Sequence, residues 1–382
     1  MKKNICFITS TRADYGLLKP VMELFKNDNK YELQIVATGM HLSQEFGETY
    51  TEIENDGFDI RDKIEILLSS DTSIGTAKSM GLAMISFSEA INRLKPDVLV
   101  VLGDRYEIFA MCSVAVVMRV PIVHLYGGET TEGAFDEVFR HSITKMSYLH
   151  FTSTEEYRKR VIQLGENPKR VFNVGSLGVE NVLNYKLLSK KQLEDEINFK
   201  LNMPYGLVTY HPVTLEDKSS ERNTIELLNA LDEVKDMKFI LTKSNSDNDG
   251  RIINKLIDDF ANSNKDRIKA FTSMGNIRYL SAMKYSACVI GNSSSGIIEA
   301  PSFNVRTINI GDRQKGRIQA NSIINVKEDK ESIKNGIKKV LLQKQTNVIN
   351  PYKKENTSRI IYENIDKMLC SKINLKKKFY DI

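Results

Sequence analysis

Cysteine and histidine are scarce in this sequence, and their scarcity excludes several kinds of site. The four cysteines lie far apart and form no C-x-x-C pair, so the sequence predicts neither a disulfide framework nor a dithiol redox motif. Three of them, Cys6, Cys112 and Cys288, lie within apolar runs, and we expect the cysteines to be reduced core residues. The five histidines show no H-E-x-x-H or comparable spacing, so we expect no bound metal.

Long apolar runs are absent as well. No segment reaches the length needed to span a membrane, and the run after Met1-Lys2-Lys3 is too short for a signal peptide. The net charge of +5 is modest and comes partly from the tail 376–378, and no basic stripe is interleaved with aromatic residues. We therefore expect a cytoplasmic protein that binds neither membranes nor nucleic acids.

The chain does contain enough apolar sequence for two domains. At 382 residues, of which 41% are hydrophobic, it exceeds the usual single-domain size, and a cleft between two domains is the default ligand site. Apolar runs of strand length alternate with helical patterns, which predicts parallel α/β sheets. The expected strands are 4–10, 33–38, 98–102, 122–126 and 149–152 in the first half and 206–210, 239–242, 268–272, 287–290 and 306–309 in the second.

Capping and periodicity signals place the helices between these strands. They are expected to start at Ser43 or Glu45 and end near Asp56, to run from Thr72 or Ser73 to just before Pro96, from Thr154 to Gly165, and over 221–235, 251–262, 277–285 and 355–369. We divide the chain into an N-terminal Rossmann-like domain (1–175), a connection (176–203), a C-terminal Rossmann-like domain (204–353) and a terminal segment (354–382). The helix of that segment is of the kind that packs back on the first domain.

A turn near residue 290 carries the strongest local signal. An apolar strand ends in Gly291-Asn292-Ser293-Ser294-Ser295-Gly296, and a helical stretch follows. Unpaired N–H groups at a helix start and serine hydroxyls can bind phosphate oxygens, so the turn predicts an anion site. A serine nucleophile is not expected, because the run does not fit the G-x-S-x-G signature.

Charged side chains stand at the ends of expected strands in the first half. Arg12 follows the first strand in a turn that lacks G-x-G-x-x-G, which disfavours a nicotinamide site and favours phosphate binding, with a plain surface charge as the alternative. Asp104 follows the strand 98–102, where it is either a helix N-cap or a functional carboxylate. Glu129 and Asp136 follow the next strand.

The helix expected after Asp136 carries Glu137, Arg140 and His141 on one face. Carboxylates from neighbouring strand ends suit general acid/base chemistry, since close carboxylates push their pKa values apart. Structural ion pairing is the alternative account and is strongest for Glu137 and Arg140.

Three residues of the second half complete the set of candidates. His211 ends a strand and precedes a proline, and loops at that edge of a sheet carry function, so a functional role is favoured over a structural one. Glu299 follows the serine turn and could hold ribose hydroxyls, while Arg313 ends the next strand and could reach phosphate.

Taken together, these motifs resemble the hydrolysing UDP-N-acetylglucosamine 2-epimerases, which make N-acetylmannosamine for sialic acid synthesis. The resemblance is nearly full length and depends on the ordered set. Its motifs are Thr11–Tyr15, Thr38–Leu42, Gly103–Arg105, Gly127–Glu129, Asp136–Lys145, His211–Thr214, Gly291–Gly296 and Gly311–Gln314.

The resemblance implies a glycosyltransferase-B type architecture, in which two Rossmann-like domains face a cleft and the C-terminal domain holds most of UDP. The positions that match UDP contacts are Arg12, Ser293, Ser294, Gly296, Glu299 and Arg313. The positions that match catalytic residues are Asp104, Asp136 and His211, and those on the sugar side are His41, Arg105 and Tyr126.

The sequence departs from the family at Tyr126. Relatives often have glutamate at this position, directly before the Gly-Gly pair. Either Glu129 supplies the missing carboxylate, or Tyr126 positions the substrate while Asp104 and Asp136 transfer the protons. The change could also track the substrate, for instance a UDP-linked 2,4-diacetamido-6-deoxy sugar.

The implied mechanism is elimination of UDP across C1–C2 of the sugar to give a 2-acetamidoglucal, followed by addition of water. It requires neither a redox cofactor nor a metal. The implied partners are the UDP-sugar and further copies of the chain in a dimer or tetramer. A glycosyltransferase, a non-hydrolysing epimerase and a sugar-nucleotide sensor without turnover are the rival functions.

Overall fold

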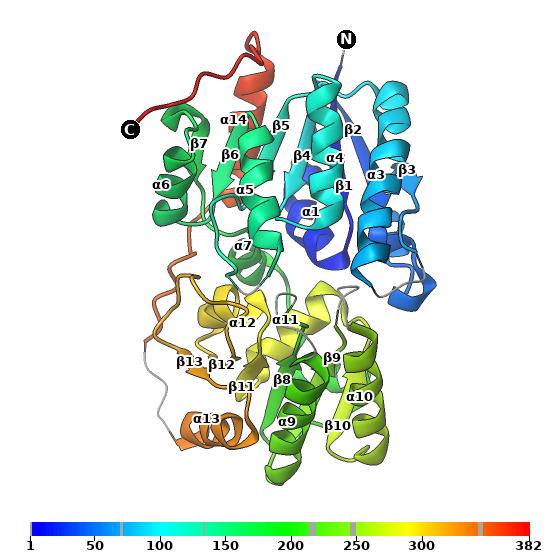
Figure 1. Cartoon of the computed structure of the whole chain (residues 1–382). Coiled ribbons are helices and arrows are strands. Elements are labelled where there is room, and N and C mark those ends of the chain that lie inside the picture. The colour runs from blue at the N-terminus through cyan, green and yellow to red at the C-terminus, as the bar shows by residue number, and fades with distance from the viewer. Residues whose placement is uncertain (1, 69–71, 133, 214–218, 245–249, 343–346) are drawn as a thin grey trace. The chain divides into compact units, whose positions relative to one another are not determined.

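The computed structural model of the chain describes residues 2–68, 72–132, 134–213, 219–244, 250–342 and 347–382. They form two compact units. Unit 1 comprises Met1–Glu129, Asp136–Glu180 and Lys354–Ile382, and unit 2 comprises Thr130–Phe135 and Asn181–Lys353. Each unit is built on a parallel sheet with helices against it, which confirms the predicted fold class of two α/β domains (Figure 1).

The sheet of unit 1 has the strand order β3-β2-β1-β4-β5-β6-β7, and all of its pairings are parallel. β1 therefore lies between β2 and β4 in the middle of the sheet. The strands are β1 (Lys3–Thr9), β2 (Tyr31–Thr38), β3 (Ile60–Ile64), β4 (Val98–Leu102), β5 (Ile122–Leu125), β6 (Leu149–Thr152) and β7 (Val171–Asn173).

Helices cover both faces of this sheet. On one face α3, α4 and α5 lie side by side, and on the other α14 packs against α1 (Figure 1). The α-helices up to the end of α7 are α1 (Arg12–Lys26), α2 (Tyr50–Asn55), α3 (Ser73–Leu94), α4 (Tyr106–Val117), α5 (Asp136–Met146), α6 (Glu155–Gln163) and α7 (Leu177–Asn184), and α14 is Thr357–Leu369. Short 3-10 helices occur at Gly39–Leu42, Gln44–Phe46 and Pro168–Arg170.

The sheet of unit 2 has the order β10-β9-β8-β11-β12-β13 and is also parallel. Its strands are β8 (Tyr205–Thr209), β9 (Lys238–Thr242), β10 (Ile268–Phe271), β11 (Cys288–Gly291), β12 (Arg306–Ile310) and β13 (Ile323–Val326). Its helices are α8 (Lys190–Ile197), α9 (Ser219–Glu233), α10 (Gly250–Ser263), α11 (Gly275–Tyr285), α12 (Ser294–Ile298) and α13 (Lys330–Leu342), with a 3-10 helix at Ala300–Phe303.

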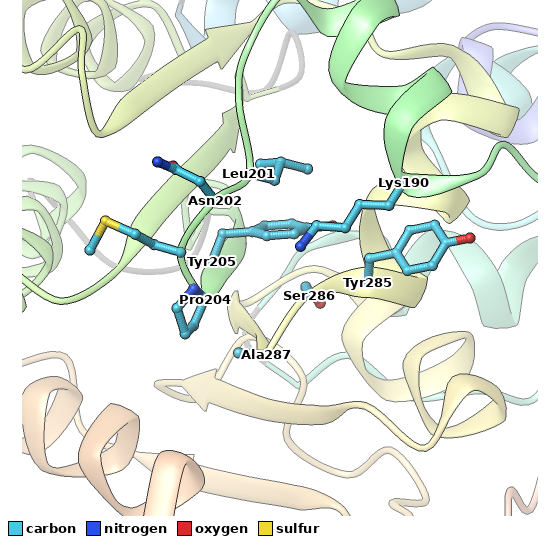
Figure 2. A pocket seen from close by; sticks show the side chains of 9 residues that line it. Lys190, Leu201, Asn202, Pro204, Tyr205, Tyr285, Ser286 and Ala287 are labelled. Carbon is cyan, nitrogen blue, oxygen red and sulfur yellow. The ribbon is translucent and has the colours of Figure 1, made fainter.

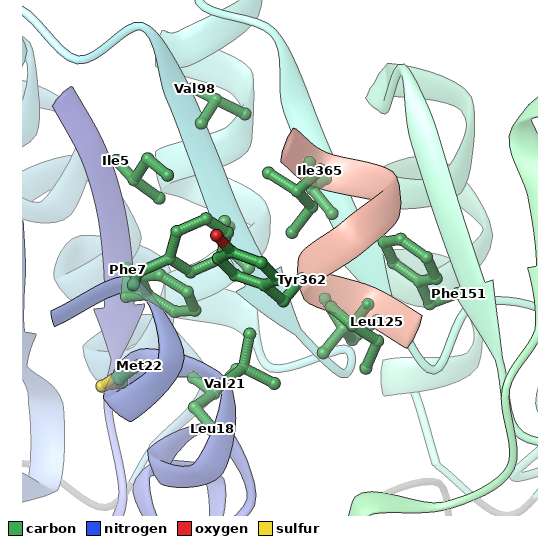
Figure 3. Close-up of a cluster of buried hydrophobic side chains, with 14 of the residues drawn as sticks. Ile5, Phe7, Leu18, Val21, Met22, Val98, Leu125, Phe151, Tyr362 and Ile365 are labelled. Carbon is green, nitrogen blue, oxygen red and sulfur yellow. The ribbon is translucent and has the colours of Figure 1, made fainter. Parts of the chain in front are cut away.

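The terminal helix α14 belongs to the core of unit 1. Its residues Tyr362 and Ile365 pack among strand residues such as Phe7 and Leu125, and the rings of Phe25 and Tyr362 lie 4.8 Å apart (Figure 3). The chain thus passes from unit 1 through unit 2 and returns to unit 1, where α14 packs in one apolar core with α1 and the sheet.

Two sequence predictions about local structure are wrong. The helix expected from Ser43 or Glu45 is instead a 3-10 turn followed by the short α2, because Gly47 adopts a left-handed conformation with φ of 86° and ends the first turn. The short edge strands β3, β7 and β13 were not expected. They contain five, three and four residues, respectively, which is too few for a clear alternation of buried and exposed positions.

The cysteines are all free. Cys6, Cys112 and Cys288 are buried, as expected, whereas Cys370 is exposed at the end of α14, which corrects the expectation for that residue. None of the helices within the described residues is both long and apolar enough to cross a bilayer.

The buried carboxylate of Glu166 binds the C-terminal tail to the rest of unit 1. Glu166, 1% exposed, accepts hydrogen bonds from Lys145 Nζ and Lys377 Nζ at 2.7 Å each and from His150 Nε2 at 3.1 Å. Lys377 Nζ also donates to the carbonyl oxygens of Lys145 and Ser147 at the end of α5. Burial alone would raise the pKa of Glu166, but the hydrogen bonds from His150 and the lysines outweigh it and lower the pKa to about 2.

We expect Glu166→Gln to lower the free energy of unfolding at pH 7 by about 2 kcal/mol. The folded-state pKa lies below the ordinary value of 4.5, so this stabilisation is present above that pH and is lost as the pH falls towards 2. Urea denaturation of both proteins between pH 7 and pH 2 measures the difference. The control is Glu155→Gln, which removes a half-exposed partner of Arg158 and should cost less than about 1 kcal/mol. Equal effects of the two substitutions at pH 7 would contradict the role given to Glu166.

Candidate active site

The candidate residues of unit 1 gather at the carboxyl edge of its sheet. Because β1 neighbours both β2 and β4, the connections leaving β1 and β4 run in opposite directions, which opens a crevice at this edge in parallel α/β sheets. Arg12 is the first residue of α1 after β1, and Asp104 and Arg105 follow β4. Asp136 is the first residue of α5.

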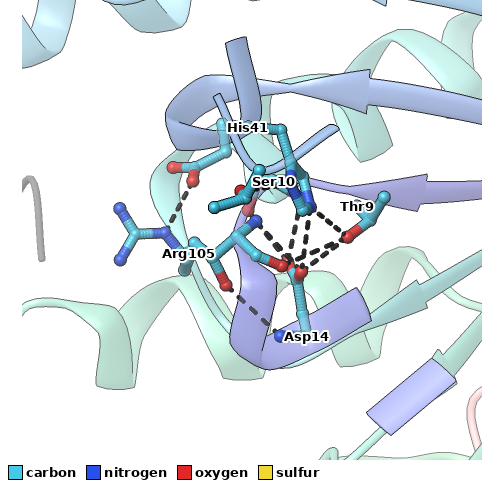
Figure 4. Close-up of polar contacts among 8 residues, drawn as sticks. Thr9, Ser10, Asp14, His41 and Arg105 are labelled. Carbon is cyan, nitrogen blue, oxygen red and sulfur yellow. Dashed lines mark hydrogen bonds and ion pairs between the residues drawn. The ribbon is translucent and has the colours of Figure 1, made fainter. Parts of the chain in front are cut away.

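Asp14 organises the turn that presents Arg12. Its carboxylate accepts hydrogen bonds from Thr9 Oγ1 at 2.6 Å, from Ser10 N and Oγ at 3.0 Å each, and from Thr11 N at 3.0 Å (Figure 4). Thr11 Oγ1 in turn accepts from Asp14 N, which completes a capping box at the start of α1. The turn is thereby fixed by side chains rather than by glycines.

His41 is fully buried behind this turn. Because Asp14 can only accept, the Thr9 hydroxyl donates to it, and His41 Nε2–H therefore donates to Thr9 Oγ1 at 2.9 Å. Nδ1 then accepts from Thr49 Oγ1 at 2.8 Å. Burial lowers the pKa of His41, although the neighbouring Asp14 raises it. With both ring nitrogens engaged, His41 supports the turn, and its predicted contact with the sugar stays a prediction.

Asp104 forms an ion pair with Arg140 of α5. Arg140 is 2% exposed and also donates to Glu137 Oε2 at 3.1 Å, while His141 Nε2 lies 3.0 Å from Glu137 Oε1. Structural ion pairing is the alternative that the sequence left open for Glu137 and Arg140, and the structure contains this ion pair. It extends to Asp104, which the sequence did not indicate. The guanidinium holds two carboxylates of the edge in fixed positions.

His124 fixes the backbone beside Asp104. Burial lowers its pKa to about 3, so the ring is neutral at physiological pH. Its Nε2–H donates to the carbonyl oxygen of Gly103 at 2.8 Å. Its Nδ1 lies 3.2 Å from Thr144 Oγ1 of α5, whose hydroxyl donates to the carbonyl oxygen of Arg140 at 3.0 Å. A Cβ at Gly127 would lie 2.9 Å from Thr144 Oγ1 and 3.0 Å from His124 Nδ1, so this contact requires glycine. β4, β5 and α5 meet at this point.

Glu107 is a buried carboxylate that sequence reasoning missed. It is 1% exposed, and its Oε1 accepts from Arg105 Nε at 2.6 Å (Figure 4). It lies in the first turn of α4, where an acidic residue is ordinarily explained by the helix dipole, so nothing in the sequence distinguished it. The pair orients the Arg105 side chain.

Tyr126 and Glu129 lie after β5. Tyr126 has a left-handed backbone with φ of 68°, an unusual conformation for an aromatic residue, and its hydroxyl lies 3.0 Å from Ser176 Oγ. Glu129 is 2% exposed and accepts from Ser153 Oγ at 2.6 Å. Both residues lie at the predicted edge, and the two alternatives, that Glu129 supplies the missing carboxylate or that Tyr126 positions the substrate, stay predictions.

In unit 2 the connections leaving β8 and β11 run in opposite directions, as those leaving β1 and β4 do in unit 1. The two strands pair so that Gly291 is opposite Thr209. A Cβ on Gly291 would lie 1.9 Å from the carbonyl oxygen of Thr209, and its φ is 130°, so this position accepts only glycine. The close approach brings the serine turn beside the end of β8, where His211 lies.

Asn292 is the second residue that sequence reasoning missed, and it joins three strand ends. It is fully buried, its Oδ1 accepts from His211 N and its Nδ2 donates to His211 O, both at 2.8 Å. Its carbonyl oxygen accepts from Gln314 Nε2 at 2.8 Å and from Arg313 Nη1 at 3.2 Å. The sequence placed Asn292 in the turn but could not show that its amide matches the backbone of His211. Thr214, the last residue of that histidine's motif, lies outside the described residues.

The serine turn is held by hydroxyl groups. Ser293 Oγ lies 3.1 Å from Ser295 Oγ, which lies 2.6 Å from the hydroxyl of Tyr279 on α11. Ser293 is the N-cap of α12 and Ser294 its first residue, but α12 has only five residues, so its dipole is weaker than the sequence suggested. Glu299 caps the other end of α12.

Gly296 has a packing role. A Cβ there would lie 2.7 Å from Thr307 Cγ2, and its carbonyl oxygen accepts from Thr307 Oγ1 at 2.6 Å. The glycine therefore lets α12 lie close to β12. Its predicted contact with UDP stays a prediction, as do those of the other turn residues.

A surface cavity of about 420 Å³ lies elsewhere in unit 2 (Figure 2). Tyr205 and Ala287 line it at the amino ends of β8 and β11, together with Lys190 and Tyr285. It is at the opposite end of the strands from the serine turn and holds none of the candidate residues.

Comparison with known proteins finds matches over most of the chain. The sequence model of the UDP-N-acetylglucosamine 2-epimerase family matches residues 23–366. A Campylobacter jejuni protein named GDP/UDP-N,N'-diacetylbacillosamine 2-epimerase (hydrolyzing) is 49% identical over 323 residues, 85% of this chain and 84% of its own. The polysialic acid biosynthesis protein P7 of Escherichia coli is 41% identical over 385 residues, which cover 100% of this chain and 98% of that protein.

Solved structures agree on the fold. A UDP-GlcNAc 2-epimerase from Neisseria meningitidis, determined bound to UDP-GlcNAc, superimposes with a TM-score of 0.78 over 95% of this chain and 100% of its own. Its sequence identity is 18%, so the likeness concerns the arrangement of the elements.

Proposed function

Because the chain belongs to the UDP-N-acetylglucosamine 2-epimerase family and the names of its relatives support the hydrolysing type, we propose that it converts UDP-N-acetylglucosamine and water into UDP and N-acetylmannosamine. The observation that carries the proposal is that the two sheet edges hold different kinds of functional group. Carboxylates gather at the edge of unit 1, around Asp104, and hydroxyl and guanidinium donors at the edge of unit 2, around Asn292.

The proposed reaction has two steps. A carboxylate, Asp104, Asp136 or Glu129, removes the proton from C2, and the C1–O bond breaks with its electron pair leaving on the diphosphate, which gives UDP and the 2-acetamidoglucal. A proton then adds to C2 from the opposite face and water adds to C1, which gives the free 2-epimer. His211 is the fourth acid/base candidate.

The negative charge that develops on the leaving diphosphate needs positive partners. Arg12 and Arg313 supply charge, and the hydroxyls of Ser293 and Ser294 supply hydrogen bonds. Glu299 is the proposed partner of the ribose hydroxyls. His41, Arg105 and Tyr126 are the proposed sugar-side residues, with His41 acting through the turn after β1.

Proton NMR of UDP-N-acetylglucosamine with the enzyme in D2O tests the proposal. We expect UDP release and N-acetylmannosamine that carries deuterium at C2. Release of UDP without deuterium would exclude the elimination, and formation of UDP-N-acetylmannosamine would indicate a non-hydrolysing epimerase. Release that requires an added acceptor would indicate a glycosyltransferase, and tight UDP binding without any reaction would indicate a sensor.

The 49% identical relative favours a second candidate substrate, UDP-N,N'-diacetylbacillosamine, undergoing the same reaction. It differs from the first candidate by an acetamido group at C4 and by the missing hydroxyl at C6. Values of kcat/KM for the two UDP-sugars, measured with one enzyme preparation, decide between them. A preference for the diacetamido sugar of more than tenfold would assign the enzyme to it.

Ser294→Ala should weaken UDP binding while leaving the chemical step nearly unchanged. Loss of a neutral hydrogen bond costs about 1 kcal/mol, and loss of a charge-assisted one up to about 3. Isothermal titration calorimetry with UDP measures the affinity for UDP, and kcat at saturating substrate measures the rate of the chemical step. Ser302→Ala, on the following 3-10 helix, serves as the control and should leave both unchanged. An unchanged UDP affinity in Ser294→Ala would remove this residue from the proposed site.

A further inference from the structure

The two glycines after β5 fix the path of the chain directly before Glu129. A Cβ at Gly127 would lie 2.9 Å from Thr144 Oγ1 of α5, and a Cβ at Gly128 would overlap the carbonyl oxygen of Tyr157 of α6. Gly128 also has a φ of 77°, so its position accepts only glycine. The backbone therefore contacts both α5 and α6 here, which fixes where Glu129 lies.

Two side chains from the segment that begins and forms α6 hold Glu129 and the residue before it. Ser153 directly precedes Thr154, the N-cap of α6, and its Oγ donates to Glu129 Oε1 at 2.6 Å. Arg160 Nη1 of α6 donates to the carbonyl oxygen of Gly128 at 2.5 Å. Ser153 and Glu129 are 1% and 2% exposed, so their hydrogen bond is shielded from water, where it is stronger than at the surface. It restricts the Glu129 carboxylate to a defined position.

Tyr126 is held by a different part of unit 1. Its side chain is 8% exposed and belongs to the apolar core of this unit. Its hydroxyl lies 3.0 Å from Ser176 Oγ and accepts a hydrogen bond from Gly178 N at 3.4 Å, at the start of α7. A hydroxyl engaged there stabilises the packing of α7, which leaves Glu129 as the carboxylate of this turn.

We propose that Ser153 is a positioning residue that holds the Glu129 carboxylate for proton transfer, and that Glu129 rather than Tyr126 supplies the missing carboxylate. The inference rests on the proposed function, in which Glu129 is one of three candidate carboxylates. The proton moves between C2 of the sugar and a carboxylate oxygen, as in the reaction above, and no further reactant takes part. A carboxylate that is free to rotate spends less time at the distance that proton transfer requires, about 2.6–3.2 Å between heavy atoms. Ser153 acts through Glu129 and does not itself react.

Ser153→Ala is expected to lower kcat by about tenfold, because the carboxylate loses its fixed position. Glu129→Gln should lower kcat by about 10²–10⁴-fold, the usual contribution of a general acid or base. In both variants the affinity for UDP should change less than a few-fold, because the residues proposed for UDP lie in unit 2, apart from Arg12. The rate of UDP release from the better of the two UDP-sugars gives kcat, and titration calorimetry gives the affinity for UDP.

Ser147→Ala is the matched control, because it removes a buried serine hydroxyl from the same unit. Ser147 follows the end of α5, and its Oγ donates to the carbonyl oxygen of Ile143 at 2.7 Å. We expect kcat close to that of the wild type, and equal losses of kcat in Ser147→Ala and Ser153→Ala would overturn the proposal. Circular dichroism establishes that each variant is folded. Should Glu129→Gln not fold, Glu129→Asp takes its place, since aspartate keeps the charge but withdraws the carboxylate from Ser153.

The double variant Ser153→Ala/Glu129→Gln separates positioning from a purely structural role. In the Glu129→Gln enzyme, Ser153→Ala should change kcat less than about twofold, because the carboxylate that Ser153 holds is gone. The same loss of kcat in both backgrounds would show that Ser153 acts through the fold alone and would overturn the proposal. Glu129→Gln that retains more than about a tenth of the wild-type kcat would overturn it as well. A wild type that releases UDP from neither UDP-sugar would instead overturn the proposed function.

Discussion

Asp104→Asn is expected to lower kcat by about 10²–10⁴-fold, the usual contribution of a general acid or base, while the affinity for UDP changes less than a few-fold. The residue lies at the carboxyl end of β4, and asparagine keeps its shape but cannot take up a proton. The residues proposed for UDP lie in unit 2, apart from Arg12. Steady-state kinetics and titration with UDP measure the two effects.

Asp97→Asn is the matched control, because Asp97 stands just before the amino end of the same strand. There it accepts from Asn4 N at 2.8 Å and pairs with Lys3, far along the strand from the candidate site. We expect kcat close to that of the wild type. If Asp104→Asn retained more than about a tenth of the wild-type kcat, proton transfer would have to be assigned to Asp136, Glu129 or His211.

Arg140→Met is expected to lower the free energy of unfolding by about 3 kcal/mol. Methionine keeps much of the apolar stem but leaves the carboxylates of Asp104 and Glu137 without their cation, and breaking a buried ion pair costs about 3–5 kcal/mol. The lower end applies because the Asp104 and Glu137 side chains are still 20% and 23% exposed. Urea denaturation monitored by circular dichroism measures the change.

Two further variants separate the lost ion pair from lost packing. Arg158→Met removes a cation from a partly exposed ion pair with Glu155 and also removes the hydrogen bond that Arg158 Nε donates to the carbonyl oxygen of Val171. We expect loss of the ion pair to lower the free energy of unfolding by less than about 1 kcal/mol, in addition to the cost of that hydrogen bond. The double variant Asp104→Asn/Arg140→Met should cost less than the sum of its single changes, because the uncompensated carboxylate is gone. Additive costs would show that Arg140 stabilises the fold through packing alone.

The motifs at strand ends were predictable because each depends on a few consecutive residues. Arg12, Asp104 and the Gly291–Gly296 turn all follow apolar runs of strand length, and a polar side chain after such a run lies at the end of a strand. The contacts that hold these residues were not predictable. Asn292 was indistinguishable from any turn asparagine until its amide was seen to pair with the backbone of His211.

The sequence by itself determined the two α/β halves, the residue types at each strand end and the family motifs, because local periodicity and short motifs carry that information. Only the tertiary structure decided that β4 pairs with β1 and β11 with β8. Parallel pairing joins segments far apart in the chain, and no local pattern specifies which of several similar apolar strands become neighbours. The same pairing places Asp104 near the turn of Arg12 and the serine turn beside His211.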